Sequence, residues 1–338
     1  MHMADALLSP AVGVSMCAVS AGAVVYAAAK IKKEELDEKK IPVMGVMGAF
    51  VFAAQMINFT IPATGSSGHI GGGILLAAVL GGGPAFLTIT AVLIIQCLLF
   101  ADGGLLALGC NVFNMGLIPC LLVYPLLFKP LMGRSFGVRR LTAPSILGVV
   151  LGLQLGAFAV VVETLASGIT ALPFATFLAF MQPIHLAIGL VEGIVTAAVL
   201  HFVFAVRPEL LESAAAGTKI PAVPMKKVLL ILGVLTLVTA GGLSLYASGY
   251  PDGLEWSVEA VTGSSELEAR GVIHSAAAFL QKTTALLPDY DFPQEVGRSA
   301  VPGTSAAGLV GGALTFGVAI SCGLVISAMK KKAKNKAA

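Results

Sequence analysis

The chain has 338 residues, of which 57% are hydrophobic and 12% charged, and its formal net charge is +3. A soluble globular protein carries about a quarter charged residues, so this composition excludes an ordinary soluble domain and favours a polytopic membrane protein. The net charge is too small to indicate a nucleic-acid partner, and no basic patch with interleaved aromatic residues accompanies it.

Apolar runs that can form membrane-spanning helices recur along the whole chain. A spanning helix needs about 20 apolar residues, and lysine and arginine mark its cytoplasmic end. We expect about nine such helices, at 11–29, 42–62, 70–83, 84–101, 107–128, 142–165, 185–206, 228–248 and 303–329. The stretch 173–182 is too short to span, so we expect it to re-enter the membrane or to lie at its interface.

The basic residues predict how the chain is oriented. They gather at 30–40, at 129–140, at 207–227 and in the C-terminal KKKAKNK, and an even number of expected helices joins each consecutive pair of clusters. Clusters that all face the cytoplasm place the N-terminus outside and the C-terminus inside. We therefore expect an all-α, multi-pass protein of the plasma membrane.

The composition shifts sharply at 207–227, which is polar, basic and proline-bearing, as expected for a cytoplasmic linker. The predicted organisation is a seven-helix membrane unit at 1–206, this linker, and a two-helix unit at 228–329. An outside loop at 249–302 joins these last two helices. Residues 330–338 form a basic cytoplasmic tail.

Four of the five histidines fall on the expected outer face, and His274 among them lies in the outside loop. The other three are His2 at the terminus, His69 after the second helix, and His185 where the seventh helix opens. We expect these three to lie within reach of a common pocket. Because an interfacial histidine is not costly, chance clustering is the alternative.

His2 stands next to the free amine of Met1, and methionine is normally removed only before a small residue, so we expect Met1 to be retained. The Met1 amine, the His2 amide and the His2 imidazole can close two fused chelate rings around one ion. His69 can fill the fourth position. Four nitrogens in a plane suit Ni(II) or Cu(II), and Co(II) can use them with added ligands. The alternative is that His2 is an accident of a frayed terminus.

The loop NFTIPATGSSGHIGGG supports this site. Its glycines allow close approach of the backbone, while Ser66 and Ser67 offer hydroxyl groups behind the ligands. Packing of helices on small glycine residues is the alternative.

Two pairs of polar residues lie inside apolar runs, where polar groups are functional candidates. Asn111 and Asn114 are three residues apart on one helix face, and His185 and Glu192 are seven apart on another. Either pair can orient a ligand imidazole through its N–H group. Hydrogen bonding between helices is the alternative for both pairs.

The motifs MHMADALLSP, GSSGHIGGG, GCNVFNMG and HLAIGLVEG, all within 1–206, resemble the substrate-binding membrane component of cobalt/nickel energy-coupling-factor transporters, the CbiM/NikM type. Residues 228–329, with PDGLE and LPDYDFP, resemble the PDGLE-type small partner subunit. The resemblance implies a metal held by Met1, His2 and His69. It also implies separate partners, a transmembrane coupling protein and a cytoplasmic ATPase, and no organic cofactor.

The function that we expect is capture of a divalent ion, with Ni²⁺ favoured and Co²⁺ next, for ATP-driven uptake, and not catalysis. A stand-alone ion-coupled transporter is one alternative, but it needs charged pairs at mid-membrane, and Glu192 is the only plausible buried acid. A membrane metallo-enzyme is another alternative. His185 and Glu192 would have to serve it without the spacing of an HExxH motif.

Overall fold

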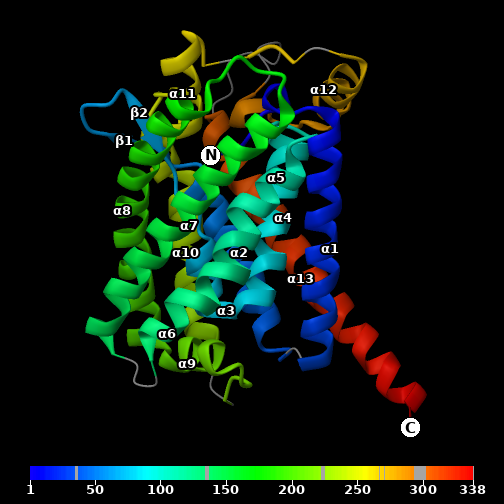
Figure 1. The fold of residues 1–338 in the computed structure, drawn as a ribbon. Helices are drawn as coiled ribbons and strands as arrows, with labels where there is room; N and C mark the ends of the chain where they lie inside the picture. The colour runs from blue at the N-terminus through cyan, green and yellow to red at the C-terminus, as the bar shows by residue number, and fades with distance from the viewer. Residues whose placement is uncertain are drawn as a thin grey trace.

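The computed structural model describes residues 1–34, 37–133, 137–221, 225–265, 267–269, 271–292 and 302–337. Its architecture is a bundle of long apolar helices (Figure 1). Within these residues the strands are confined to one small antiparallel hairpin, β1 (Phe59–Ile61) with β2 (Ser66–Gly68). The prediction of an all-α polytopic membrane protein is confirmed.

The helices follow one another along the bundle before and after the predicted linker. Up to residue 206 they are η1 (Asp5–Leu7), α1 (Pro10–Glu34), α2 (Lys40–Gln55), α3 (Gly73–Leu80), α4 (Gly82–Phe100), α5 (Leu108–Val112), the π-helical η2 (Phe113–Phe128), α6 (Lys129–Met132), α7 (Val138–Ser167) and α8 (Phe174–Val206). Beyond it they are α9 (Pro208–Ala216), α10 (Lys226–Gly241), η3 (Leu243–Tyr246), α11 (Gly253–Thr262), α12 (Val272–Thr284), η4 (Pro288–Tyr290) and α13 (Gly303–Ala337).

Six helices of the described residues are long and apolar enough to cross a membrane. The other three predicted spans correspond to shorter helices, α2, α3 and α10. The run 70–83 departs most from expectation, because α3 has only 8 residues. Its length of about 12 Å is less than half of a bilayer core of about 30 Å. Every residue of α3 is buried, so its hydrophobicity serves the protein interior and not the lipid.

The prediction for 173–182 is wrong in detail. These residues form the first turns of α8, a single helix of 33 residues that continues through Pro183. Gln154 of α7 and Gln182 each donate a side-chain hydrogen bond to the other's main-chain oxygen, at 2.9 and 3.3 Å. These two bonds tie α8 to α7 just before Pro183. His185 therefore lies about three turns inside α8 and does not open it.

The last helix, α13, joins the bundle by packing on α2. A Cβ atom at Gly311 of α13 would overlap the ring of Phe52, and one at Gly45 of α2 would lie 2.8 Å from Ile320. Small residues at both surfaces thus allow the two helices to approach closely. The helices that follow the predicted linker are consequently part of one bundle with those that precede it.

The two ends of the bundle differ in character. Figure 1 shows α6, α9 and the C-terminus at one end, and the β-hairpin, α11 and α12 at the other. The described residues of the basic clusters lie at the first end, as the even number of helices between clusters requires. Which end faces the cytoplasm stays a prediction.

Candidate metal site

The chain begins inside the bundle, not on its surface (Figure 1). Met3 and Leu8 are completely buried, and Met1 is 7% exposed. The Asn111 side chain accepts a hydrogen bond from the Met3 N–H at 2.8 Å and donates one to the Met3 carbonyl at 3.3 Å. The amide of Gly104 donates to the same carbonyl at 2.8 Å. The main-chain N–H and carbonyl groups of Met3 are thus both hydrogen-bonded, as they would be in a strand.

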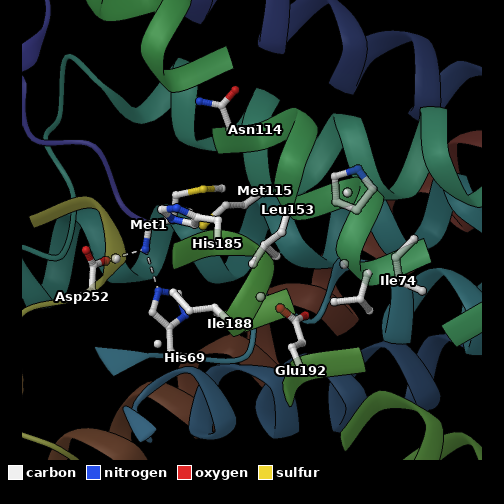
Figure 2. Close-up of a pocket in the computed structure, with 17 residues that line it drawn as sticks. Met1, His69, Ile74, Asn114, Met115, Leu153, His185, Ile188, Glu192 and Asp252 are labelled. Atoms are coloured by element: carbon white, nitrogen blue, oxygen red, sulfur yellow. Dashed lines mark hydrogen bonds and ion pairs between the residues drawn. The ribbon is translucent and has the colours of Figure 1, made fainter. Parts of the chain in front are cut away.

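The terminal amine meets His69. The Met1 nitrogen lies 2.9 Å from His69 Nε2 and 2.5 Å from Asp252 Oδ2, as Figure 2 shows. The His2 ring stacks on the His69 ring with centroids 5.1 Å apart and planes 11° apart. The three residues predicted to supply ligands are therefore neighbours.

The loop that carries His69 is anchored from three directions. The Ser67 amide donates to the carbonyl of Pro251 at 2.8 Å. Glu192 of α8 accepts from the Gly72 amide at 2.9 Å, and Gln55 of α2 donates to the Gly71 carbonyl at 2.9 Å. Gly72 has a φ of +77°, which only glycine adopts without strain. These anchors fix the imidazole against the chain terminus.

The charges at the terminus perturb the groups around it. Burial, and after it the positive terminal amine and His2, lower the pKa of His69 to about 3. The imidazole is therefore neutral near pH 7, as a metal ligand must be. Burial would raise the pKa of Asp252, but the terminal amine and His69 hold it well below its usual range.

His2 has an acidic partner of its own. His2 Nδ1 lies 3.0 Å from Asp102 Oδ1, and the hydroxyl of Tyr290 donates to Asp102 Oδ2. Burial would raise the pKa of Asp102, but the charge of His2 and the hydrogen bonds from His2 and Tyr290 lower it to about 2. His2 Nε2 is buried and has no hydrogen-bond partner among the described residues.

The predicted orienting pairs make other contacts. Asn111 binds Met3, and Asn114 donates to Glu163 at 2.8 Å. His185 Nδ1 bonds the Met181 carbonyl at 2.7 Å, and Glu192 binds the His69 loop through Gly72. The Ser66 and Ser67 hydroxyls reach main-chain oxygens of residues 250 and 251, and not the His69 ring.

The contacts to the terminal amine and the His2 ring come instead from Asp252 and Asp102, which sequence reasoning did not single out. Each acid lies in a glycine-containing loop on the predicted outer face, within FADGG and PDGLE. That location was the available signal, but only the tertiary fold brings the two loops to the terminus.

Two cavities flank the terminus. The inner one has a volume of about 40 Å³ and is lined by Met1, His69, His185, Glu192 and others (Figure 2). Within the described residues, Asn114 Oδ1, His185 Nε2 and Glu192 Oε2 have no hydrogen-bond partner. The outer cavity measures about 500 Å³ and includes His2, His69 and five acidic residues. These are Asp5, Asp102, Asp252, Glu255 and Asp289.

In the part of the chain that the structure describes, no three His, Cys, Asp or Glu side chains converge closely enough to hold one metal ion. Main-chain nitrogen, however, lies close to the His69 ring. The buried terminal amine is beside His69, with the His2 amide one residue further on.

Comparisons with known proteins show two families along the chain. Residues 2–210 match the family described as CbiM, cobalt uptake substrate-specific transmembrane region, and residues 226–328 match the PDGLE domain. The chain is 30% identical to the fused nickel transport protein NikMN of Rhodobacter capsulatus, over 96% of this chain and 98% of that protein.

It is also 31% identical to the cobalt transport protein CbiM of Sorangium cellulosum, over 54% of this chain and 80% of that protein. A crystal structure of a transition metal transporter is similar in fold, with a TM-score of 0.54 at 31% identity. That similarity covers 63% of this chain and 97% of the solved one.

Proposed function

This chain belongs to the CbiM family of cobalt uptake substrate-specific transmembrane regions, and on that premise we propose that it captures a divalent transition-metal ion on the extracytoplasmic side for ATP-driven uptake. The ligands are the amine of Met1, the amide nitrogen and imidazole of His2, and the imidazole of His69. The observation that carries the proposal is the buried terminal amine, 2.9 Å from His69 Nε2.

That distance suits two ligands of one ion. Nitrogen ligands at about 2.0 Å from a metal, at right angles to one another, are about 2.8 Å apart. The amine and His69 already have this spacing. The chelate ring through the His2 amide closes on Nδ1, which contacts Asp102 at 3.0 Å. On capture, Nδ1 of His2 therefore gives up its contact with Asp102 and binds the ion instead.

The ligand set supports Ni²⁺ over Co²⁺. Four nitrogens in a plane match the geometry that Ni(II) prefers, while Co(II) favours added ligands. A relative that is similar over nearly the whole chain is named a nickel transport protein, which points the same way. Copper would bind such a set most tightly, so discrimination against it rests on the availability of the metal.

The chain is a multi-pass protein of the plasma membrane with six long apolar helices among its described residues. We expect its units to be 1–206 and 228–329, joined by the linker 207–227. The energy for uptake is assigned to a separate transmembrane coupling protein and a cytoplasmic ATPase, as the resemblance to energy-coupling-factor transporters implies.

Metal titration of the purified full chain tests the proposal. His2→Ala and His69→Ala each remove a ligand, so the affinity for Ni²⁺ falls beyond the 10–100-fold that is typical for loss of an outer-shell partner. His201→Ala is the matched control, because that imidazole bonds Thr142 instead, at 3.2 Å. Tight nickel binding by both ligand variants would refute the ligand assignment.

A second test leaves every side chain intact. An N-terminal extension of a few residues moves the free amine away from His69, and we expect it to abolish capture. Unchanged uptake by the extended chain would exclude the amine as a ligand.

A further inference from the structure

Asp252 uses its two carboxylate oxygens for two different purposes. Oδ1 accepts from the amides of Leu254 and Glu255 at 2.8 and 2.9 Å and so caps α11. Oδ2 faces away from this helix and contacts the Met1 amine at 2.5 Å. The Met1 and Asp252 side chains are only 7% and 14% exposed. A helix cap explains the first oxygen but not the second.

The carboxylate is also fixed relative to the His69 loop. The Ser67 amide donates to the Pro251 carbonyl at 2.8 Å, and the Ser67 hydroxyl donates to the Tyr250 carbonyl at 2.8 Å. A β-bridge pairs Ser67 with Asp252 itself. The segment before α11 therefore pairs in parallel alongside β2, the strand that leads to His69. It places the carboxylate and the imidazole on either side of one amine.

A second residue from beyond the linker reaches the terminus from the other side. Tyr290 of η4 donates to Asp102, whose other oxygen contacts His2. Its ring stacks on Phe100 of α4, with centroids 5.1 Å apart. Residues that follow the linker thus contact the terminal amine directly and the His2 imidazole through one carboxylate.

We propose that the segment after the linker completes the capture site, with Asp252 as a positioning residue that holds the Met1 amine against His69. The proposal rests on the function proposed above. A first residue without such a partner is free to fray, and its ordering would have to be supplied each time an ion binds.

The contact with Asp252 persists in the loaded site. A coordinated amine still carries hydrogens to donate to Oδ2, as ligands commonly do to a carboxylate behind them. The negative charge of Asp252 also balances the positive site. One divalent ion replaces one proton from the amine and one from the amide, so the net charge beside Asp252 is unchanged.

Asp252→Ser separates positioning from helix capping. Serine is a good N-cap and preserves α11, but its side chain is too short to reach the amine. We expect the affinity for Ni²⁺ to fall about 10–100-fold, the usual cost of losing an outer-shell partner. At saturating nickel the visible spectrum stays that of the wild type, because the ligands are the same.

Glu255→Gln is the matched control. It removes one negative charge from the same helix but keeps the capping box, in which glutamine replaces glutamate well. We expect its nickel affinity to stay within about twofold of the wild type, because the glutamine oxygen can still accept from the Asp252 amide as Glu255 does at 3.0 Å. Asp252→Asn, which preserves shape and cap while it removes the charge, is the second variant if Asp252→Ser does not fold.

The outcomes distinguish this inference from the proposed function. A folded Asp252 variant that binds Ni²⁺ as tightly as the wild type overturns the positioning role and leaves the capture function standing. A changed spectrum at saturation overturns it too, because it would make Asp252 a direct ligand. A wild-type chain that binds no Ni²⁺ refutes the capture function itself.

Discussion

Asn111→Ala tests how the buried terminus is held. The Asn111 side chain pairs with both main-chain groups of Met3, which is completely buried. After truncation the Met3 carbonyl keeps the Gly104 amide at 2.8 Å, but its N–H group loses its partner. An unpaired buried donor costs about 1–3 kcal/mol.

This cost destabilises the buried position of the terminus before it destabilises the bundle, because the first residues can leave that position while the helices stay packed. The lost free energy then lowers the affinity for nickel. With a factor of ten for each 1.4 kcal/mol, nickel binding weakens about 5–150-fold. Isothermal titration of the purified chain measures it.

Ser20→Ala is the control for this variant, because it removes a buried hydrogen bond of 2.6 Å between α1 and the Gly109 carbonyl, away from the terminus. We expect its thermal stability to fall with little change in nickel affinity. An Asn111→Ala chain that binds nickel like the wild type would refute the idea that Met3 anchors the ligands.

Three further outcomes follow from the structure. Capture releases about two protons per ion, one from the amine and one from the amide, so nickel binding tightens as pH rises. Calorimetry in two buffers of different ionisation enthalpy measures the number of protons released, and no release would argue against amide ligation. Burial lowers the pKa of His69 from 6.5 to about 3. The contribution of neutral His69 to folding stability is therefore present above pH 6.5 and is lost as pH falls toward 3, because only the unfolded chain binds that proton. His69→Ala should flatten the pH dependence of the unfolding temperature in this range, and an unaltered profile would show that the imidazole is not buried. Gly103→Ala should weaken nickel binding, because Gly103 has a φ of +78° and its new Cβ would lie 2.7 Å from Asn111 Nδ2 and 3.2 Å from His2 Cβ. Gly133→Ala is the control, because it has similar backbone strain but its Cβ would have nothing within 4 Å. An equal loss of nickel affinity in both variants would count against crowding of His2.

Hydropathy and the basic clusters were enough to predict the helical class and to sort residues between the two ends of the bundle. This works because the membrane constrains length and charge position more strongly than packing does. His2 and His69 could therefore be placed together, and the structure puts the Met1 amine 2.9 Å from His69. Their role as ligands stays a prediction.

Helix lengths were less predictable where a run is apolar because it lies in the protein interior and not in the lipid. The run 70–83 is hydrophobic because α3 is buried on all sides, and hydropathy alone does not separate an interior helix from a spanning one. The stretch 173–182 was separated from the run 185–206 because it is too short to span by itself, whereas α8 continues from Phe174 through Pro183 to Val206.

The partners of the terminus were the hardest part to predict. Asp102 and Asp252 are 150 residues apart, and neither stands at a helical spacing from a ligand. Their meeting at Met1 and His2 depends on the docking of the PDGLE segment onto the His69 loop. The polar pairs within helices have a helical spacing that marks them as candidates, but three of the four residues bond main-chain groups, of Met3, Met181 and Gly72. The fourth, Asn114, bonds the Glu163 carboxylate of α7.

The most direct test of the account is an X-ray absorption spectrum at the nickel edge of the loaded full-length protein. We expect a planar site with four nitrogen neighbours, among them two imidazoles, and the loss of one imidazole in His69→Ala. A six-coordinate shell dominated by oxygen, or a spectrum unchanged by His69→Ala, would contradict capture of the ion by the chain terminus.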